Sequence, residues 1–330
     1  MPMPRVPAVP LAAALLCLPF IAARAQQAQS PQPVEPPEVY GMLTYSRGQP
    51  VIPAYEGWHP NPDGTIDLWF GYLNQNYREE PEVPIGPENN VASPYGGGVD
   101  AGQPSHFLPR NNRWVFKVRV PKDFGDKEVV WTLTSHGKTY RAYATLKPSY
   151  VHDDMGMQRE YNFDPPAVEN KPPNIHVEGD DHRSAKVGDA VTLTAFVTDD
   201  GVPKPGAGRN GAAAARAAGN PSLCEERTPQ SCGEPNEGAG NLFSVKGLRM
   251  GCFIYRGGSA VAFNPPQPKM WEDHRGGSPW AAGYVLPPIP EGNKWIVQAT
   301  FKEPGTYVVR CLAHDGFLQT PADVTFTVTP

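Results

Sequence analysis

The sequence predicts an all-β protein, built of two tandem antiparallel β-sandwich domains that follow a signal peptide. The first observation is that apolar and polar residues alternate with period two along short runs, as in strands with one buried face. The second is the content of 40 prolines and 33 glycines in 330 residues, which disfavours long helices. The third is that no segment repeats apolar residues at helical spacing. Short strands joined by many turns fit all three observations.

The N-terminus predicts export. Arg5 precedes an apolar stretch interrupted by prolines, and Ala23-Arg24-Ala25 is a small-x-small cleavage pattern. We expect a signal peptide at 1–25, then a disordered, Pro-rich linker at 26–37. An uncleaved anchor is the alternative, but prolines disfavour a spanning helix. No later run is long and apolar enough to span a membrane, so we expect no membrane span after cleavage and a periplasmic or secreted protein.

The first domain is expected at 38–148, followed by an extended connector at 149–172. A tight turn at 135–138 separates two of its strands. Alternation within "TIDLWFGYLN", "RWVFKVRV" and "EVVWTLT" predicts the inward-facing residues, which are Ile66, Leu68, Phe70, Tyr72, Trp114, Phe116, Val118, Val120, Val129, Trp131 and Leu133.

The second domain is expected at 173–330, with long insertions at 202–241 and 265–293. Seven strands are predicted, beginning with "NIHVEG" as a short edge strand and ending with "ADVTFTVT". Alternation gives the inward-facing residues of three of the strands as Val191, Leu193, Ala195, Val197, Leu248, Met250, Cys252, Ile254, Trp295, Val297, Ala299 and Phe301.

The second half resembles a known class of module. "VGDAVTLTAFVTDDG", "EPGTYVVRCLAHDG" and "DVTFTVT" are similar to the PKD and bacterial Ig-like β-sandwich modules of exported proteins. The resemblance implies an Ig-like sandwich over about 173–330 and a role in spacing, adhesion or glycan contact. The two insertions depart from the compact form of that family. The first half, with "EGW", "FGYLNQNY" and "GPENN", resembles a group of uncharacterised exported bacterial proteins and implies no mechanism.

Four cysteines remain once Cys17 leaves with the signal peptide. An even number in an exported chain predicts two disulfides. In Ig-like topology the third and sixth strands are neighbours, so Cys252 is expected to pair with Cys311; two buried free thiols are the alternative. Cys224 and Cys232 would then close a small loop in the first insertion, and a zinc site there is disfavoured because no CxxC or paired-His spacing is present.

Motifs for catalysis are missing from the sequence. It contains no HExxH, GxSxG, P-loop or GxGxxG after a strand. The net charge of −5 and the lack of a basic run indicate no nucleic-acid partner. The sequence therefore favours a protein that is not an enzyme and predicts no cofactor and no metal site, although an enzyme assembled from dispersed His and acidic residues stays open.

The strongest cluster of candidate binding residues lies between 58 and 106. Aromatic rings with amides suit a sugar or peptide ligand, whereas asparagines also cap turns and bond local backbone. We expect this segment to be mainly one strand, 65–74, framed by Asn-rich turns, with a ligand face as the alternative. The candidate ligand-binding residues are Trp58, His59, Asp63, Trp69, Asn74, Asn76, Asn89, Asn90, Gln103 and His106.

Two further segments carry weaker signals. The loop 271–284, "WEDHRGGSPWAAGY", holds four charged or titratable residues between two tryptophans, which equally fits a loop packed onto the sheet. Carboxylates at 151–154 and 178–182 leave calcium binding near the domain junction open, without EF-hand spacing. The Asp199-Asp200-Gly201 and Asp315-Gly316 pairs are interpreted as turns.

Together these features predict an exported, non-catalytic binding or assembly protein of the bacterial cell envelope. Its partner would be an envelope protein or a glycan that the sequence does not identify. A carbohydrate-binding protein that uses segment 58–106 is the first alternative.

Overall fold

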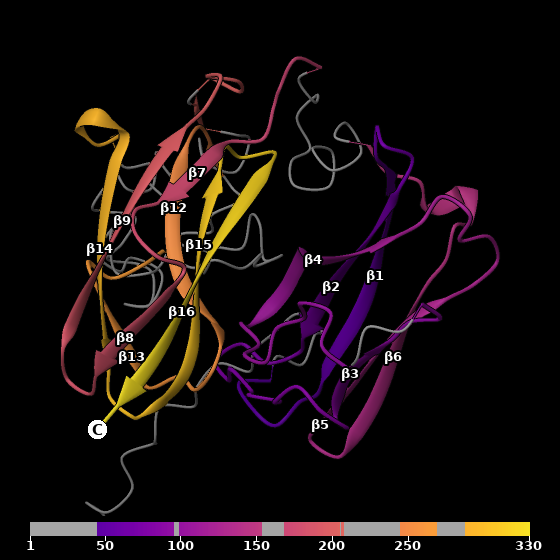
Figure 1. The fold of residues 1–330 in the computed structure, drawn as a ribbon, viewed down its shortest axis with the longest axis horizontal. Helices are drawn as coiled ribbons and strands as arrows, with labels where there is room; N and C mark the ends of the chain where they lie inside the picture. The colour runs from indigo at the N-terminus through magenta and orange to yellow at the C-terminus, as the bar shows by residue number, and fades with distance from the viewer. Residues whose placement is uncertain (1–44, 96–98, 154–167, 205, 208–244, 269–287) are drawn as a thin grey trace, which may run out of the picture. The chain divides into compact units, whose positions relative to one another are not determined.

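The computed structural model describes residues 45–330 except 96–98, 154–167, 205, 208–244 and 269–287 (Figure 1). The signal peptide, the linker, the Cys224–Cys232 pairing and the 271–284 loop lie outside the described residues. The described residues belong to one compact unit, Tyr45–Pro330. In the described part of the chain, no helix is of a length and apolarity that would cross a membrane.

The first sandwich consists of two three-stranded antiparallel sheets, β1-β2-β4 and β3-β5-β6 (Figure 1). The first sheet contains β1 (Val51–Pro60), β2 (Ile66–Asn74) and β4 (Arg110–Val120). The second contains β3 (Asn89–Ala92), β5 (Val129–Ser135) and β6 (Lys138–Ala144), and the short helix η1 (Pro148–Tyr150) follows. The all-β fold class is thus confirmed for this half.

A single aromatic core joins these two sheets. Phe70 and Phe116, from the first sheet, stack with ring centroids 5.1 Å apart. Trp131 of β5 meets both rings edge-on, at 6.1 and 4.9 Å. The predicted inward residues of β2 and β5 are all buried, so the alternation located this core correctly.

Two expectations for this half need correction. Trp114 does not share a face with Phe116, because the β2–β4 register shifts between Phe70 and Tyr72 and Trp114 has a φ of 54°. Trp114 is buried outside the core cluster, with its ring edge-on to Trp69 at 6.1 Å. The alternation indicates no particular strand at 51–60, yet β1 forms there; it lies at the edge of its sheet, where Pro53 is tolerated.

The second sandwich consists of two four-stranded sheets, β12-β15-β16-β8 and β13-β14-β9-β7 (Figure 1). The first sheet contains β12 (Arg249–Arg256), β15 (Gly305–His314), β16 (Gln319–Thr329) and β8 (His182–Lys186). The second contains β13 (Val261–Asn264), β14 (Lys294–Phe301), β9 (Ala190–Thr198) and β7 (Asn174–Val177), with η4 (Glu291–Asn293) just before β14. A separate short pair joins β10 (Gly206–Ala207) to β11 (Val245–Lys246).

The two sheets of this half contain eight strands in the described residues, one more than predicted, besides the short β10–β11 pair. The additional strand, β8, lies parallel to β16 at the edge of one sheet. The strand before it, β7, pairs with β9 at the edge of the other sheet. The first two strands of this sandwich therefore belong to different sheets, which the seven-strand prediction did not include. Most predicted inward residues are buried in the second core, while Val191 and Trp295 pack against it only partly buried.

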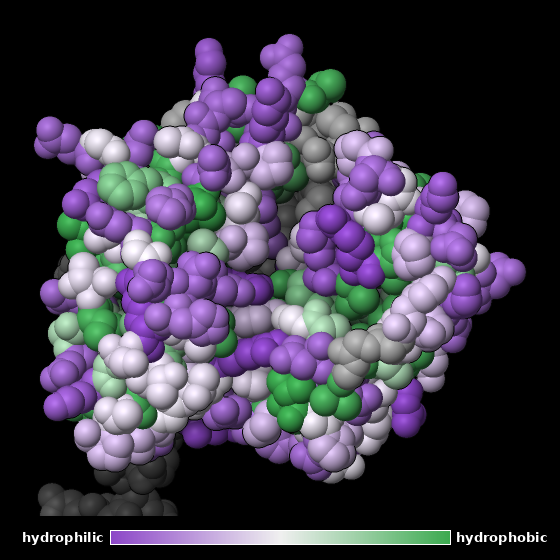
Figure 2. Space-filling view, in the orientation of Figure 1, coloured by the Kyte–Doolittle hydropathy of each residue, from purple (hydrophilic) through white to green (hydrophobic). Residues whose placement is uncertain are grey.

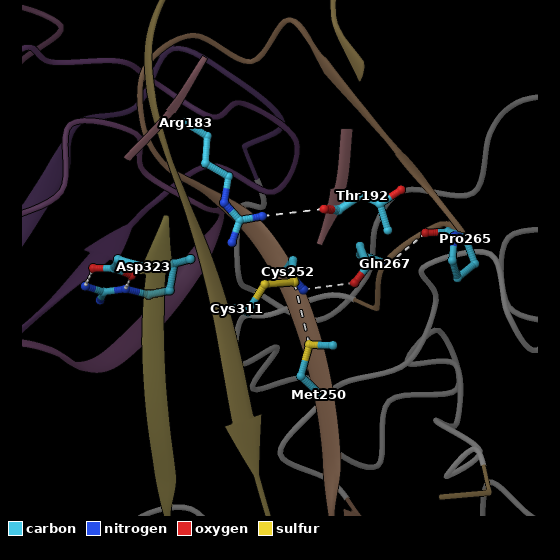
Figure 3. Close-up of a disulfide and its surroundings, with 9 residues drawn as sticks. Arg183, Thr192, Met250, Cys252, Pro265, Gln267, Cys311 and Asp323 are labelled. Atoms are coloured by element: carbon cyan, nitrogen blue, oxygen red, sulfur yellow. Dashed lines mark hydrogen bonds and ion pairs between the residues drawn. A yellow bond between two sulfur atoms is a disulfide. The ribbon is translucent and has the colours of Figure 1, made fainter. Parts of the chain in front are cut away.

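The predicted Cys252–Cys311 disulfide is present (Figure 3). Cys252 of β12 and Cys311 of β15 are directly opposed, with Cα atoms 4.0 Å apart. The backbone N–H of Cys252 donates to Gln267 Oε1 at 2.8 Å, and Gln267 Nε2 donates to the Pro265 carbonyl at 2.7 Å. The bridge thus lies in the core and joins the edge strand β12 to its neighbour β15, and the loop that contains Gln267 is hydrogen-bonded beside it.

Hydrogen bonds also join the two sandwiches within the compact unit. Arg310 Nη1 donates to the Val115 carbonyl at 2.6 Å, and Tyr255 Oη donates to the Gly102 carbonyl at 2.6 Å. Arg256 forms a two-point ion pair with Asp100 at 2.9 and 2.8 Å. On the face shown in Figure 2, hydrophilic residues predominate and hydrophobic ones form separate groups.

Candidate functional site

The strand register assembles a row of charged and aromatic side chains on the solvent side of sheet β1-β2-β4. His59, Asp67 and Arg119 are directly opposed across the three strands, and so are Gly57, Trp69 and Lys117. Opposed residues of antiparallel strands share a face. Because Leu68 and Phe70 point into the core, these six residues form the other face, which we call the outer face.

Asp67 organises the charges of the outer face. Its carboxylate accepts hydrogen bonds from Lys117 Nζ at 2.6 Å and from Arg119 Nε at 2.8 Å. Its side chain is 3% exposed, whereas those of Lys117 and Arg119 are 43% and 53% exposed. Burial opposes ionisation, but the hydrogen bonds from Arg119 and Lys117 outweigh it and lower the pKa of Asp67 to about 2. Asp67 is therefore an anion at neutral pH, beneath two half-exposed cations.

Trp69 adds an aromatic surface next to these charges. Its ring is half-buried, with Lys117 Nζ 5.1 Å from the centroid and the Trp114 ring edge-on. A cation within about 6 Å of an indole is attracted to the ring. The outer face is thus partly preorganised: the positions of Lys117 and Trp69 are fixed by neighbours while both stay accessible.

The connector crosses β1 at one margin of the outer face. His152 N–H donates to the Trp58 carbonyl at 2.9 Å, and His59 Nδ1 lies 3.0 Å from the His152 carbonyl. A Cβ on Gly57 would collide with the His152 ring and lie 2.6 Å from the Tyr150 carbonyl. Glycine is therefore required for this close crossing. Burial lowers the pKa of His152, and nearby Arg113 lowers it further despite Asp153.

Three of the predicted ligand-binding residues lie on or beside this face. His59 and Trp69 belong to it, and exposed Asp63 lies in the β1–β2 turn, where its carboxylate accepts from Thr65 N and Oγ1 at 2.9 and 2.6 Å. Trp58 does not join them. It opposes Leu68, faces the core and donates Nε1–H to the Lys147 carbonyl at 3.0 Å.

The predicted amides bond mainly to backbone. Asn74 Nδ2 donates to the Glu79 and Phe107 carbonyls, and Asn76 Nδ2 to the Gln49 carbonyl. Asn89 Nδ2 donates to the Val83 and Pro104 carbonyls, and Gln103 Nε2 to the Val99 carbonyl. All four residues are fully buried, whereas Asn90 is half-buried and donates to the Pro87 carbonyl.

The histidines predicted for a shared site have separate partners. His106 is buried, and its Nε2 lies 2.8 Å from Glu80 Oε2. His59 instead meets the connector on the outer face. Among the residues that the structure describes, no three His, Cys, Asp or Glu side chains gather as they would around a metal ion.

Sequence reasoning missed Asp67, Lys117 and Arg119. The signal was present, because alternation in "RWVFKVRV" places Lys117 and Arg119 opposite the core face. The sequence pattern does not predict the β2–β4 register, which brings both cations to Asp67.

No protein-family model and no curated protein matches the sequence. Among solved structures, the chain is similar to domains 4 and 5 of the S-layer protein SbsC (7% identity, 62% of this chain and 66% of that chain, TM-score 0.21). It is also similar to immunoglobulin domains 1–4 of Sidekick-1 (11% identity, 84% of this chain and 48% of that chain, TM-score 0.22). A third similar structure is the D0–D1 domain of intimin (10% identity, 83% of this chain and 97% of that chain, TM-score 0.22). The chain spans just under two thirds of the length of the SbsC structure and about half of the Sidekick-1 structure. These TM-scores are too low to carry an argument about function.

Proposed function

We propose that the chain is an exported, non-catalytic binding or assembly protein of the bacterial cell envelope. The observation that carries this proposal is the outer face, where Asp67 holds Lys117 and Arg119 beside the accessible ring of Trp69. Aromatic and Arg side chains are enriched at protein interfaces. A carboxyl group with a pKa of about 2 is poorly matched to proton transfer at neutral pH. The core disulfide suits an oxidising compartment.

The first experiment tests export. The full chain is expressed with its own N-terminus in a Gram-negative host, and the N-terminal residue of the extracted protein is determined. Export with cleavage after Ala25 is expected in the periplasmic fraction. Uncleaved protein in the cytoplasm would contradict this part of the proposal.

The second experiment tests binding through the outer face. Periplasmic extract is cross-linked to purified full-length protein and to two variants. Trp69→Ala/Lys117→Ala removes the aromatic ring and one cation from the outer face, whereas Tyr143→Ala removes a ring that is 52% exposed on the other sheet. A specific cross-linked partner should be lost with the first variant and retained with the second. Equal capture by both variants would reject the outer face as the binding surface.

Carbohydrate binding is a second candidate function, favoured by the accessible Trp69 ring with charged hydrogen-bond donors beside it. A glycan should then change the tryptophan fluorescence of the wild type, and Trp69→Ala should abolish the change. Trp58→Ala serves as the comparison, because Trp58 faces the core and should affect stability instead of binding. A fluorescence response that persists in Trp69→Ala would exclude this site.

A further inference from the structure

A cleft lies between β4 of the first sandwich and strands β12, β15 and β16 of the second. Among the residues that line it are Trp114 of β4, Phe253 of β12, Leu312 of β15 and Gln319 of β16. The cleft has a volume of about 40 Å³ and is partly open to solvent. Because a cavity of about 10–15 Å³ is enough to hold one water, this cleft has room for a larger group.

Several polar side chains that line the cleft already have partners within the protein. Arg310 donates to the Val115 carbonyl at 2.6 Å and, through two other nitrogens, to the Asp323 carboxylate. Tyr255 Oη donates to a backbone carbonyl at 2.6 Å. Asn112 Nδ2 donates to backbone carbonyls at 3.2, 3.0 and 3.1 Å. These groups therefore shape the cleft and have their main hydrogen bonds elsewhere.

Two buried polar atoms of lining residues have no hydrogen-bond partner in the described part of the chain, and they point to a ligand. Trp114 is 2% exposed, and its Nε1–H finds no acceptor there. Gln319 Nε2 donates to the carbonyls of Arg113 and Trp114 at 3.4 and 3.2 Å, but Gln319 Oε1 finds no donor. A buried polar atom without a partner costs free energy, which a ligand with the matching group would recover.

The chemistry of these two atoms defines the class of ligand. One unmatched donor and one unmatched acceptor fit a group that has one of each, and a peptide unit has one C=O and one N–H. A carboxylate only accepts and an ammonium group only donates, while a sugar ring brings several hydroxyl groups that would each need a partner. The apolar lining, which includes Phe253, Leu312 and Pro321, suits an apolar side chain next to the peptide unit.

We propose that this cleft binds one peptide unit of a partner protein, together with an adjoining apolar side chain. The peptide carbonyl accepts from Trp114 Nε1–H, and the peptide N–H donates to Gln319 Oε1. This inference rests on the proposed function, because it assumes that the chain binds a partner, and it identifies that partner as a protein. The cleft is a site separate from the outer face, so variants of the two surfaces distinguish failure of one from failure of the other.

The test uses a probe with a single peptide unit, N-methyl-4-methylpentanamide. The full chain is labelled with ¹⁵N-tryptophan, and the indole N–H resonance of Trp114 is assigned by its absence in Trp114→Phe. This resonance should shift saturably with the probe, with a Kd of about 1–10 mM for so small a ligand. The matched ester, methyl 4-methylpentanoate, lacks the N–H and should bind about fivefold more weakly, which corresponds to one hydrogen bond. Methyl glucoside should leave the resonance in place.

Variants locate the binding site of the probe. Gln319→Ala removes the acceptor and should weaken binding about fivefold, whereas Gln298→Ala, the same change at an exposed position of β14, should bind as the wild type does. Arg119→Ala changes the outer face and should also leave binding unchanged. The comparison of amide with ester in the wild type keeps the test decisive if Gln319→Ala does not fold.

Four outcomes would overturn the proposal. They are no saturable shift of the Trp114 resonance, equal affinity for amide and ester, a shift caused by methyl glucoside, and weaker binding by Arg119→Ala than by Gln319→Ala. The first would mean that the cleft holds water alone, the second that the acceptor plays no part, and the third that hydroxyl groups are the ligand. The fourth would mean that the probe binds the outer face.

Discussion

Single polar residues show most clearly what the sequence could not reveal. The sequence predicts either ligand contacts or backbone hydrogen bonds for four amides, and in the structure all four are buried and hydrogen-bonded to backbone: Asn74, Asn76, Asn89 and Gln103. Residue type alone cannot separate these uses, since an amide that serves a ligand and one that serves a loop have the same donors and acceptors. Burial decides it, and burial depends on partners distant in the sequence.

The adjacent residues Asn89 and Asn90 allow a matched test of this difference. Asn89→Ala removes two donated hydrogen bonds and leaves Trp131 Nε1–H without its acceptor at 3.0 Å, so we expect a loss of about 3 kcal/mol or more. Asn90→Ala removes one partly exposed hydrogen bond, so we expect a loss below about 1 kcal/mol. Urea unfolding of both variants measures the difference. Equal losses would show that the buried hydrogen bonds of Asn89 stabilise the fold no more than the single hydrogen bond of Asn90.

The Asp67 cluster predicts a pH dependence of stability. A folded-state pKa of about 2, below the ordinary aspartate value of 3.8, means that the stabilisation is present above pH 4 and is lost as the pH falls towards 2. Because both cations are about half exposed, we expect Asp67→Asn to cost only about 1–2 kcal/mol at pH 7. Denaturant unfolding between pH 7 and pH 3 should show the variant approaching the wild type. A constant difference over this range would mean that the carboxylate charge is not the cause.

At the scale of elements, alternation predicted the strands whose faces differ most. In β2, β5 and β9 the core side is apolar throughout, so the pattern alone located them. It failed at β1, where prolines and a glycine obscure the alternation, and at β8, a five-residue strand with one buried residue. Both lie at sheet edges, where neighbours and not the local pattern decide whether a strand forms.

The crossing of the connector over β1 depends on one glycine. Gly57 has a φ of 138°, and a Cβ there would collide with His152 and the Tyr150 carbonyl. We expect Gly57→Ala to cost about 2–3 kcal/mol and to release the connector from β1. Hydrogen exchange at the His152 amide, which bonds to the Trp58 carbonyl, measures this release.

Gly86→Ala is the control, because a Cβ at Gly86 would meet no atom within 4 Å. It should leave exchange at His152 unchanged. Protection of His152 in Gly57→Ala equal to that of the wild type would show that the crossing tolerates a side chain.

At the scale of the whole molecule, the sequence predicted two sandwiches but not how they are joined. The joining groups are dispersed: Asp100 and Gly102 lie in a loop, Val115 at a bulge, and Arg256 and Arg310 on two strands of the second sandwich. No spacing rule relates them, because they meet only after both domains have folded. Two domains joined by several hydrogen bonds should unfold together, whereas domains joined by a connector alone should not.

Arg310 provides the decisive test of this coupling. Its guanidinium forms a two-point ion pair with Asp323 at 2.7 and 2.8 Å, lies 3.4 Å from the centroid of the Tyr255 ring, and donates to Val115 across the junction. Lysine keeps the charge but cannot make these contacts at once, so we expect Arg310→Lys to cost about 2–3 kcal/mol and to divide one calorimetric transition into two. Arg256→Lys, whose partner Asp100 is half exposed, should cost less than about 1 kcal/mol and keep a single transition. If Arg310→Lys also unfolds in one transition at the wild-type Tm, Arg310 does not couple the sandwiches, and the molecule holds them together by other contacts.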